Sequence, residues 1–312
     1  MIRAAVLFPG QGSQHVGMGS EMFEARPGTL GEVADGVLGW SLRDIVLEGP
    51  EETLTRTEYA QPSLFAVSYA LWEDFIERFV GEIVGAAGHS LGEFTALCAA
   101  GVMSYEEGLR VVARRGLAMA RAADSEPSGM AALVGADERR ADEIAELRRA
   151  EGGTLQVANI NAPGQVVLAG SAKDIDWLGE QASDLGVRRV IKLKVAGGFH
   201  SSFMESAADE VAEALEAVSL SEPEFPVWSN TTAQPHRLEE MADVLRSQVV
   251  STVRFSECLQ GLAAVGVDVF VHIGPGDVTA GMVRRTIDGV PVHVVSELGD
   301  VEMVVKALGS MS

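Results

Sequence analysis

Ser90 stands at the centre of Gly88-His89-Ser90-Leu91-Gly92, a spacing typical of a serine nucleophile. A short apolar run at 83–87 precedes it and predicts a buried strand, and apolar residues at helical spacing follow it. In such a strand-to-helix turn, small flanking residues relieve crowding while the hydroxyl projects into a cleft. The amino end of the following helix directs free N–H groups and its positive dipole end toward the same place. The pattern therefore predicts a nucleophile beside a site that can stabilise an oxyanion.

A serine hydroxyl is a weak nucleophile until a base takes its proton, and histidine is the usual base at neutral pH. Of the six histidines, His200 is favoured, because the glycine-rich segment 197–201 places it where the chain passes between two predicted units. His89 adjoins the serine and is expected to point elsewhere, as a packing or turn residue. His272 ends a predicted core strand and is expected to be structural. The remaining three have no supporting context: His15, His236 and His293.

The composition is that of an ordinary globular protein, with 312 residues of which 47% are hydrophobic and 22% charged. The net charge of −21 argues against nucleic acid and anionic membranes as partners. Nothing resembles a signal peptide, and no segment approaches the roughly 18 apolar residues of a membrane helix. The two cysteines, Cys98 and Cys258, are interpreted as core residues of a reduced compartment, and no zinc motif is present. We therefore expect a cytoplasmic protein without a metal site.

The order of predicted elements changes at two turn-rich segments, 124–129 and 196–198. Outside them, helices alternate with short strands, which predicts an α/β core with a parallel sheet. Between them, the order β-α-β-β-α-β is that of a ferredoxin-like unit, with elements at 130–134, 137–150, 154–160, 165–169, 173–185 and 187–195. We therefore expect a large subdomain of residues 1–126 and 197–312 and an inserted ferredoxin-like subdomain of residues 127–196. The nucleophile would lie at the floor of the cleft between them.

A basic segment at 188–194 interrupts the acidic background. Strand geometry would place Arg188, Lys192 and Lys194 on one face. The other face would carry the apolar residues Ile191, Leu193 and Val195. Two interpretations stay open. The segment is either a solvated strand face or a docking surface for phosphates or an acidic partner.

Six separated motifs carry a resemblance to a known family. They are Phe8-Pro9-Gly10-Gln11-Gly12-Ser13-Gln14, Gly88-His89-Ser90-Leu91-Gly92-Glu93, Arg114-Arg115-Gly116, Asn161-Ala162-Pro163-Gly164-Gln165, Gly198-Phe199-His200-Ser201 and Ile273-Gly274-Pro275-Gly276. Over nearly its whole length the chain resembles the malonyl-CoA:acyl-carrier-protein transacylases, the acyltransferases of bacterial fatty acid and polyketide synthesis. The resemblance implies an α/β-hydrolase-like core with a ferredoxin-like insert, which agrees with the predicted order of elements.

The resemblance also implies roles for single residues. Ser90 would be the acylated nucleophile and His200 its base and later its acid, oriented by a carbonyl near Gln248. The backbone N–H groups of Gln11 and Leu91 would form the oxyanion hole. Two alternatives stay open here, because Gln11 could merely end a turn and Gln248 could be a surface helix residue.

Other residues would select the acyl group. Arg115 would hold the free carboxylate of the malonyl group, because its planar fork matches a carboxylate bidentately; Arg114 is the alternative. The bulky ring of Phe199 would favour malonyl over methylmalonyl, while Gly198 would leave room for roughly one methyl group. A further pair, Asn159 and Gln165, would either line the cleft or serve a structural role.

The implied reaction moves a malonyl group from coenzyme A to the phosphopantetheine thiol of an acyl carrier protein, with the coenzyme A thioester as substrate and no other cofactor. Such a protein must bring an acidic carrier and phosphates to its cleft through local positive charge, and we expect a monomer. The candidates for this contact are Arg188, Arg189, Lys192 and Lys194.

Three other functions stay open. An acyl-carrier-protein thioesterase or hydrolase on the same scaffold would keep Ser90 and His200 but would have less reason to keep Arg115. An ordinary esterase would use a later histidine, His272 or His293. A non-enzymatic interaction subunit would have only a vestigial site.

Overall fold

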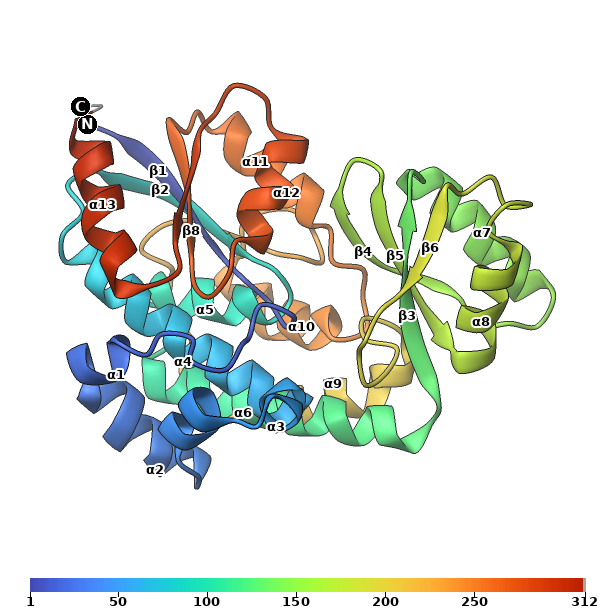
Figure 1. Cartoon of the computed structure of the whole chain (residues 1–312), viewed down its shortest axis with the longest axis horizontal. Helices are drawn as coiled ribbons and strands as arrows, with labels where there is room; N and C mark the ends of the chain where they lie inside the picture. Colours follow the sequence, from blue (N-terminus) through green and yellow to red (C-terminus); the bar gives the residue numbers. More distant parts are fainter. Residues whose placement is uncertain (311–312) are drawn as a thin grey trace.

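The computed structural model describes residues 1–310, and no helix among them is long and apolar enough to cross a membrane. Two parts lie side by side, a larger one with both chain termini and a smaller one (Figure 1). The larger part contains β1 (Arg3–Phe8), β2 (Glu82–Gly88), β7 (Val227–Trp228), β8 (Val269–Ile273) and β9 (Val292–Val295). Its helices are α1 (Met22–Ala25), α2 (Ala34–Leu38), α3 (Glu51–Thr55), α4 (Thr57–Ile76), α5 (Leu91–Ala99), α6 (Tyr105–Ser125), α9 (Glu205–Glu216), α10 (Leu238–Gln248), α11 (Phe255–Ala264), α12 (Val278–Thr286) and α13 (Leu298–Gly309). Short helical turns lie at Gly28–Val33, Asp44–Glu48 and Ser202–Met204.

The larger sheet is parallel throughout, with strand order β7-β2-β1-β8-β9. Residues 4–8 of the central strand β1 are fully buried, because helices cover both faces of a parallel sheet. Val6 and Phe8 pack in the core on the side of α4 and α5. Leu7, on the opposite face, packs on the side of α11 and α12. All five strands end at one edge, where the loops that follow β1, β2 and β7 come together.

The smaller part is an antiparallel sheet covered on one face by two helices (Figure 1). Its strands pair in the order β4-β5-β3-β6. In chain order within this unit, that is 2-3-1-4, the pairing that a β-α-β-β-α-β unit adopts when it closes on itself. The predicted fold class, a parallel α/β core with a ferredoxin-like insert, is therefore confirmed. The elements are β3 (Ser128–Val134), α7 (Glu138–Ala150), β4 (Gln156–Ala162), β5 (Gln165–Ser171), α8 (Ala172–Gln181) and β6 (Arg189–Lys192).

The basic strand differs from its prediction. It was expected over 187–195 but spans only Arg189–Lys192. Val190 pairs opposite Leu133 of β3 and packs against the core of the smaller part, whereas Ile191 is 38% exposed. Ile191 and Lys192 therefore lie on opposite faces, as the alternation predicted, but the face that carries Lys192 also packs inward through Val190.

Candidate active site

Ser90 lies on a sharp turn between β2 and α5. Its backbone adopts φ 51° and ψ −105°, a conformation that is strained for a residue with a side chain. The two flanking glycines have no room for a larger residue. A Cβ on Gly88 would lie 1.8 Å from the backbone of Gly92, and a Cβ on Gly92 would lie 2.4 Å from the carbonyl oxygen of Phe8. The predicted reason for the small residues around the serine is thus visible as direct backbone contact.

His200 meets the serine from the segment that returns from the smaller part. Its Nε2 lies 2.7 Å from Oγ of Ser90, and its Nδ1 lies 2.9 Å from the backbone oxygen of Gln248. Because a carbonyl only accepts, Nδ1 carries the proton there and Nε2 is left to accept the serine proton. Burial and the positive charge of Arg115 lower the pKa of His200 to about 3. The imidazole is therefore neutral, as a general base must be, across the physiological range.

Arg115 projects from α6 into the same site and is fully buried. Its Nη2 donates to Oγ of Ser90 at 3.0 Å and to Oε1 of Gln248 at 2.9 Å, while Nη1 donates to Oε1 of Gln61 at 2.6 Å. The guanidinium also lies over the ring of Phe94, 5.4 Å from its centroid. Burial lowers the pKa of Arg115 to about 10, so the group stays charged near neutral pH.

The neighbouring arginine points elsewhere. Arg114 lies on the outer surface of α6, where its Nη2 pairs with Glu210 at 2.9 Å. Gln248, for which a surface position was the alternative, is only 1% exposed. The fold therefore brings Arg115, and not Arg114, to the serine. It also places Gln248 beside the serine and not at the surface.

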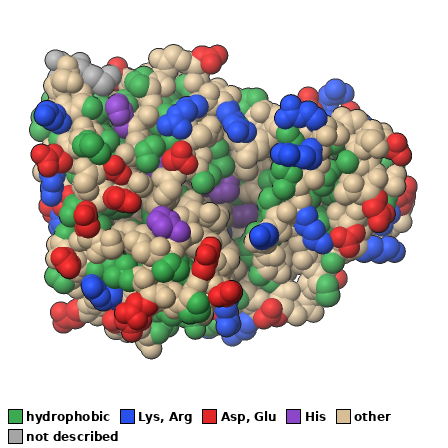
Figure 2. All heavy atoms as spheres, viewed as in Figure 1, with side chains coloured by type: hydrophobic (Ala, Val, Ile, Leu, Met, Phe, Trp, Pro, Cys, Tyr) green, Lys and Arg blue, Asp and Glu red, His purple; other side chains and the backbone are tan. Residues whose placement is uncertain are grey.

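A cavity of about 250 Å³ lies between the two parts, with Ser90 in its wall. Figure 2 shows the surface hollowed here, with histidine side chains inside and lysine and arginine side chains along the rim of the smaller part. Gln11 and Leu91, the predicted oxyanion-hole residues, also line it. Leu91 is the first residue of α5 and Gln11 follows β1, so both lie at the edge where the strands end.

The smaller part supplies the opposite wall of the cavity. Asn159 on β4 and Gln165 on β5 both line it. Each also has a structural contact, since Asn159 forms an isolated bridge with Val253 and Gln165 accepts a hydrogen bond from Arg285 at 3.1 Å. Asn159 and Gln165 therefore line the cavity and also make structural contacts, so the two interpretations of this pair are compatible.

The two residues before the base face in different directions. Phe199 is buried and lines the cavity. A Cβ on Gly198 would instead meet Ser128 at 3.2 Å and Ser201 at 3.4 Å, and neither of these lines the cavity. The extra room predicted from Gly198 is therefore wrong, because that space lies behind the cavity wall.

The four basic candidates for partner contact are separated. Lys194 lines the cavity. Lys192 is turned to α8, where it pairs with Asp176 at 2.8 Å. Arg188 and Arg189 are exposed. The expectation that Arg188, Lys192 and Lys194 share one face is therefore wrong, because the strand ends between the two lysines.

Two histidines outside the pair were expected to be structural or packing residues. His272 is fully buried and hydrogen-bonded through both ring nitrogens, to Thr279 and to the carbonyl oxygen of Gly274, which confirms its structural role. His89 points away from the serine, with Nε2 2.7 Å from Oδ1 of Asn161 and its ring edge-on to Phe255. It nevertheless lines the cavity.

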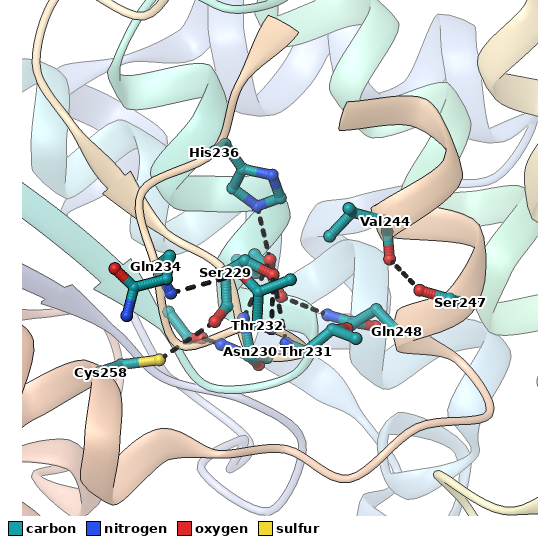
Figure 3. A network of polar contacts seen from close by, with 12 residues as sticks. Ser229, Asn230, Thr231, Thr232, Gln234, His236, Val244, Ser247, Gln248 and Cys258 are labelled. Atoms are coloured by element: carbon teal, nitrogen blue, oxygen red, sulfur yellow. Dashed lines mark hydrogen bonds and ion pairs between the residues drawn. The ribbon is translucent and has the colours of Figure 1, made fainter. Parts of the chain in front are cut away.

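Sequence reasoning missed four residues beneath the nucleophile: Gln61, Glu93, Asn230 and His236. Figure 3 shows His236 and Gln248 both directed toward the segment that carries Asn230. Oδ1 of Asn230 accepts from the backbone N–H of Ser90 at 2.7 Å, and its Nδ2 donates to the carbonyl of Gly88 at 2.8 Å. Asn230 lies just after β7, at the edge of the sheet where ligands bind in parallel α/β folds, and this position is a signal that could have revealed it. Gln61, inside a long helix, gives no such signal.

The fold and this arrangement are those of a serine acyltransferase. The family model for the acyl transferase domain matches residues 6–306. The chain is 38% identical to the malonyl CoA-acyl carrier protein transacylase of Bacillus subtilis, over 99% of this chain and 98% of that protein. The chain belongs to this acyltransferase family, as the sequence resemblance predicted.

Solved structures agree. The acyl-carrier-protein-S-malonyltransferase from Bartonella henselae superposes with a TM-score of 0.92 at 37% identity, covering 99% of this chain and 100% of that one. A malonyl-transacylase solved in complex with its type II polyketide synthase acyl carrier protein gives a TM-score of 0.92 at 32% identity, covering 98% and 99% of the two chains.

Proposed function

We propose that this protein transfers a malonyl group from coenzyme A to the phosphopantetheine thiol of an acyl carrier protein, through an acyl-serine intermediate. The observation that carries the proposal is that Arg115 and His200 both contact the hydroxyl of Ser90. A hydrolase of plain acyl chains has no use for a buried cation at that position. The relatives named above are malonyl transacylases, so the thioesterase alternative is not supported.

In the first half-reaction, Nε2 of His200 takes the hydroxyl proton as Oγ of Ser90 attacks the thioester carbon. The oxyanion accepts hydrogen bonds from the backbone N–H groups of Gln11 and Leu91. Its collapse breaks the carbon–sulfur bond, and His200 gives its proton to the departing coenzyme A thiolate. In the second half-reaction the carrier's thiol gives its proton to His200 and attacks the ester carbon. Ser90 then leaves and recovers the proton, so no cofactor beyond the thioester substrate is needed.

Arg115 selects the acyl group in this proposal. Its planar guanidinium can pair with the free malonyl carboxylate within reach of the serine. The same pairing assists the base. The charge of Arg115 is one cause of the low pKa of His200, so a bound carboxylate that offsets this charge raises that pKa and makes the imidazole a stronger base.

The acyl carrier protein is the proposed partner, since a relative of this fold has been solved in complex with such a carrier. The acyl carrier proteins used by transacylases of this family are acidic. Lys194 lines the cavity, and Arg285 lies next to it, hydrogen-bonded to Gln165 of the cavity wall. Arg188 and Arg189 add exposed positive charge on the smaller part. We also propose that the protein works as a monomer, because one chain by itself brings Ser90, His200 and Arg115 together in the site.

The test is intact-mass measurement after mixing the protein with malonyl-CoA, followed by a chase with phosphopantetheinylated carrier protein. We expect a malonyl adduct that disappears as malonyl-carrier forms. Ser90→Ala should give no adduct, whereas the matched control Ser183→Ala, at an exposed position, should behave as the wild type. An adduct on Ser90→Ala, or release of malonate with no malonyl-carrier, would contradict the proposal.

A further inference from the structure

The carboxylate of Glu93 is fully buried in the first turn of α5, beneath the nucleophile. Three donors point at it. Nε2 of Gln248 lies 2.9 Å from Oε2, while Oε1 accepts from the backbone N–H of Asn230 at 3.2 Å and from Nε2 of His236 at 2.6 Å. An ionised carboxylate can only accept hydrogen bonds, so this shell of donors suits it. Figure 3 shows the three donor residues, His236, Asn230 and Gln248, gathered in one network of polar contacts. None of the proposed chemical steps uses Glu93.

Glu93 determines which way the amide of Gln248 faces. Nε2 of that amide donates both to Glu93 and to the backbone oxygen of Ser90, the latter at 2.8 Å. Because both neighbours only accept, the amide cannot flip without placing its oxygen against two oxygens. Its Oε1 is therefore always presented to Nη2 of Arg115, 2.9 Å away.

The carboxylate of Glu93 is thus linked to the guanidinium of Arg115 by hydrogen bonds through one neutral amide, that of Gln248. Within residues 1–310, every hydrogen bond of Arg115 goes to an uncharged oxygen, on Gln61, Gln248 or Ser90. The negative charge of Glu93 nevertheless raises the pKa of Arg115 against the effect of burial. A carboxylate bound directly to Arg115 would compete with the acid group of a substrate. Because the amide of Gln248 lies between them, the carboxylate of Glu93 stabilises the cation of Arg115 and leaves that cation able to bind the acid group of a substrate.

We propose that Glu93 is a positioning residue that makes the enzyme prefer acyl groups bearing a carboxylate, by fixing Gln248 and thereby Arg115. The inference rests on the proposed malonyl transfer and adds the residue that sets up its selectivity. Glu93 also holds Asn230, whose side chain brackets the backbone of Ser90, so a change at position 93 has a second, smaller effect on every substrate. The ratio of the malonyl rate to the acetyl rate separates the two effects, because an effect shared by every substrate cancels in that ratio.

The variant Glu93→Gln tests this, because it keeps the shape and replaces one acceptor oxygen by an NH₂ donor. In either orientation that NH₂ faces a donor, from Gln248 on one side or from Asn230 on the other. The measurement is the single-turnover rate of acyl-enzyme formation with malonyl-CoA and with acetyl-CoA, which lacks the carboxylate. We expect the malonyl-to-acetyl ratio to fall about tenfold, the effect of losing one well-placed bond to a charged group. General damage to the fold would lower both rates alike.

The matched control is Glu146→Gln, the same chemical change at an exposed position on α7, which should keep the wild-type ratio. A wild-type enzyme that malonyl-CoA does not acylate would sink the proposed function itself. An acylated wild type with an unchanged ratio in Glu93→Gln would overturn only the role of Glu93.

Should Glu93→Gln fail to fold, the donor that holds the carboxylate offers a second test. His236→Leu removes the donor to Oε1, and His236→Gln can keep one. We expect a lowered malonyl-to-acetyl ratio in His236→Leu and a ratio close to the wild type in His236→Gln. Equal ratios in wild type and both variants would overturn the inference.

Discussion

Nη2 of Arg115 and Oγ of Ser90 lie 3.0 Å apart, although one residue is on α6 and the other precedes α5. The cation that would bind the acid end of the acyl group and the oxygen that would bind its carbonyl end are thus neighbours before any substrate arrives. A malonyl group is short, so both of its ends can be engaged at once only in such an arrangement. The short distance between these two groups therefore favours a short acyl group that carries a carboxylate.

Replacing Arg115 with lysine should separate charge from geometry. Lysine keeps the positive charge but loses the planar fork, so we expect kcat/KM for malonyl-CoA to fall about a hundredfold, with little change in acylation by acetyl-CoA. Steady-state kinetics with both thioesters measures this. Arg114→Lys is the control, since Arg114 lies outside the cavity. Equal losses with both thioesters would contradict the assigned role.

Lowering the pH should destabilise the folded protein through His200. Its pKa is about 3 in the folded protein and about 6.5 when unfolded, so the unfolded chain binds more protons between these values. Stability is therefore lost as the pH falls below about 6.5. Between pH 7 and pH 5 this one histidine accounts for about 2 kcal/mol of that loss.

Urea unfolding at the two pH values, for wild type and His200→Ala, checks this prediction. The variant should lose about 2 kcal/mol less than the wild type over the same interval. Identical pH dependence in the two proteins would show that the folded state does not hold this imidazole neutral.

Widening the cavity at Phe199 should relax the choice of acyl group. Phe199→Ala removes a ring from the wall, so we expect the ratio of methylmalonyl-CoA to malonyl-CoA turnover to rise about tenfold. Gly198→Ala is the paired control, because its added methyl would point to Ser128 and Ser201 and away from the cavity. Competition between the two thioesters, read by intact mass, gives the ratio directly. A shift in Gly198→Ala as large as in Phe199→Ala would contradict this geometry.

Charge reversal should separate two lysines that lie two positions apart. Lys194→Glu, in the cavity wall, should raise KM for the carrier protein several-fold and flatten the dependence of that KM on salt. Lys192→Glu should have little effect, because Lys192 is already paired with Asp176 on α8. Transfer assays over a range of salt concentrations test both. Equal effects of the two reversals would favour a diffuse basic surface over a contact at the cavity.

The order of elements and the meeting of Ser90 with His200 could be predicted from sequence, because each depends on a local signal. A strand, a crowded turn and a helix locate the nucleophile, and a glycine-rich return segment locates the histidine. The register of the basic strand could not be predicted. Alternation alone allowed either face, and pairing with β3 decided that Val190 turns inward.

The support beneath the site was harder to foresee. Glu93 and His236 are 143 positions apart, and their contact exists only because β7 pairs beside β2 and brings the segment after it under the turn. Gln61 reaches Arg115 from the interior of a long helix, where nothing in the local pattern marks it. Such contacts depend on tertiary packing, which periodicity and motif spacing do not encode.

The hydrogen bond from His200 to the carbonyl of Gln248 has one more consequence. That carbonyl belongs to the last residue of α10, so the imidazole is tethered to the body that carries Ser90, even though the chain reaches it from the small antiparallel sheet. A displacement of that sheet would have to break the bridge of Asn159 to Val253 and the hydrogen bond of Gln165 to Arg285, but it would leave the reacting pair together. Such a movement of one wall would change access to the cavity without separating Ser90 from His200.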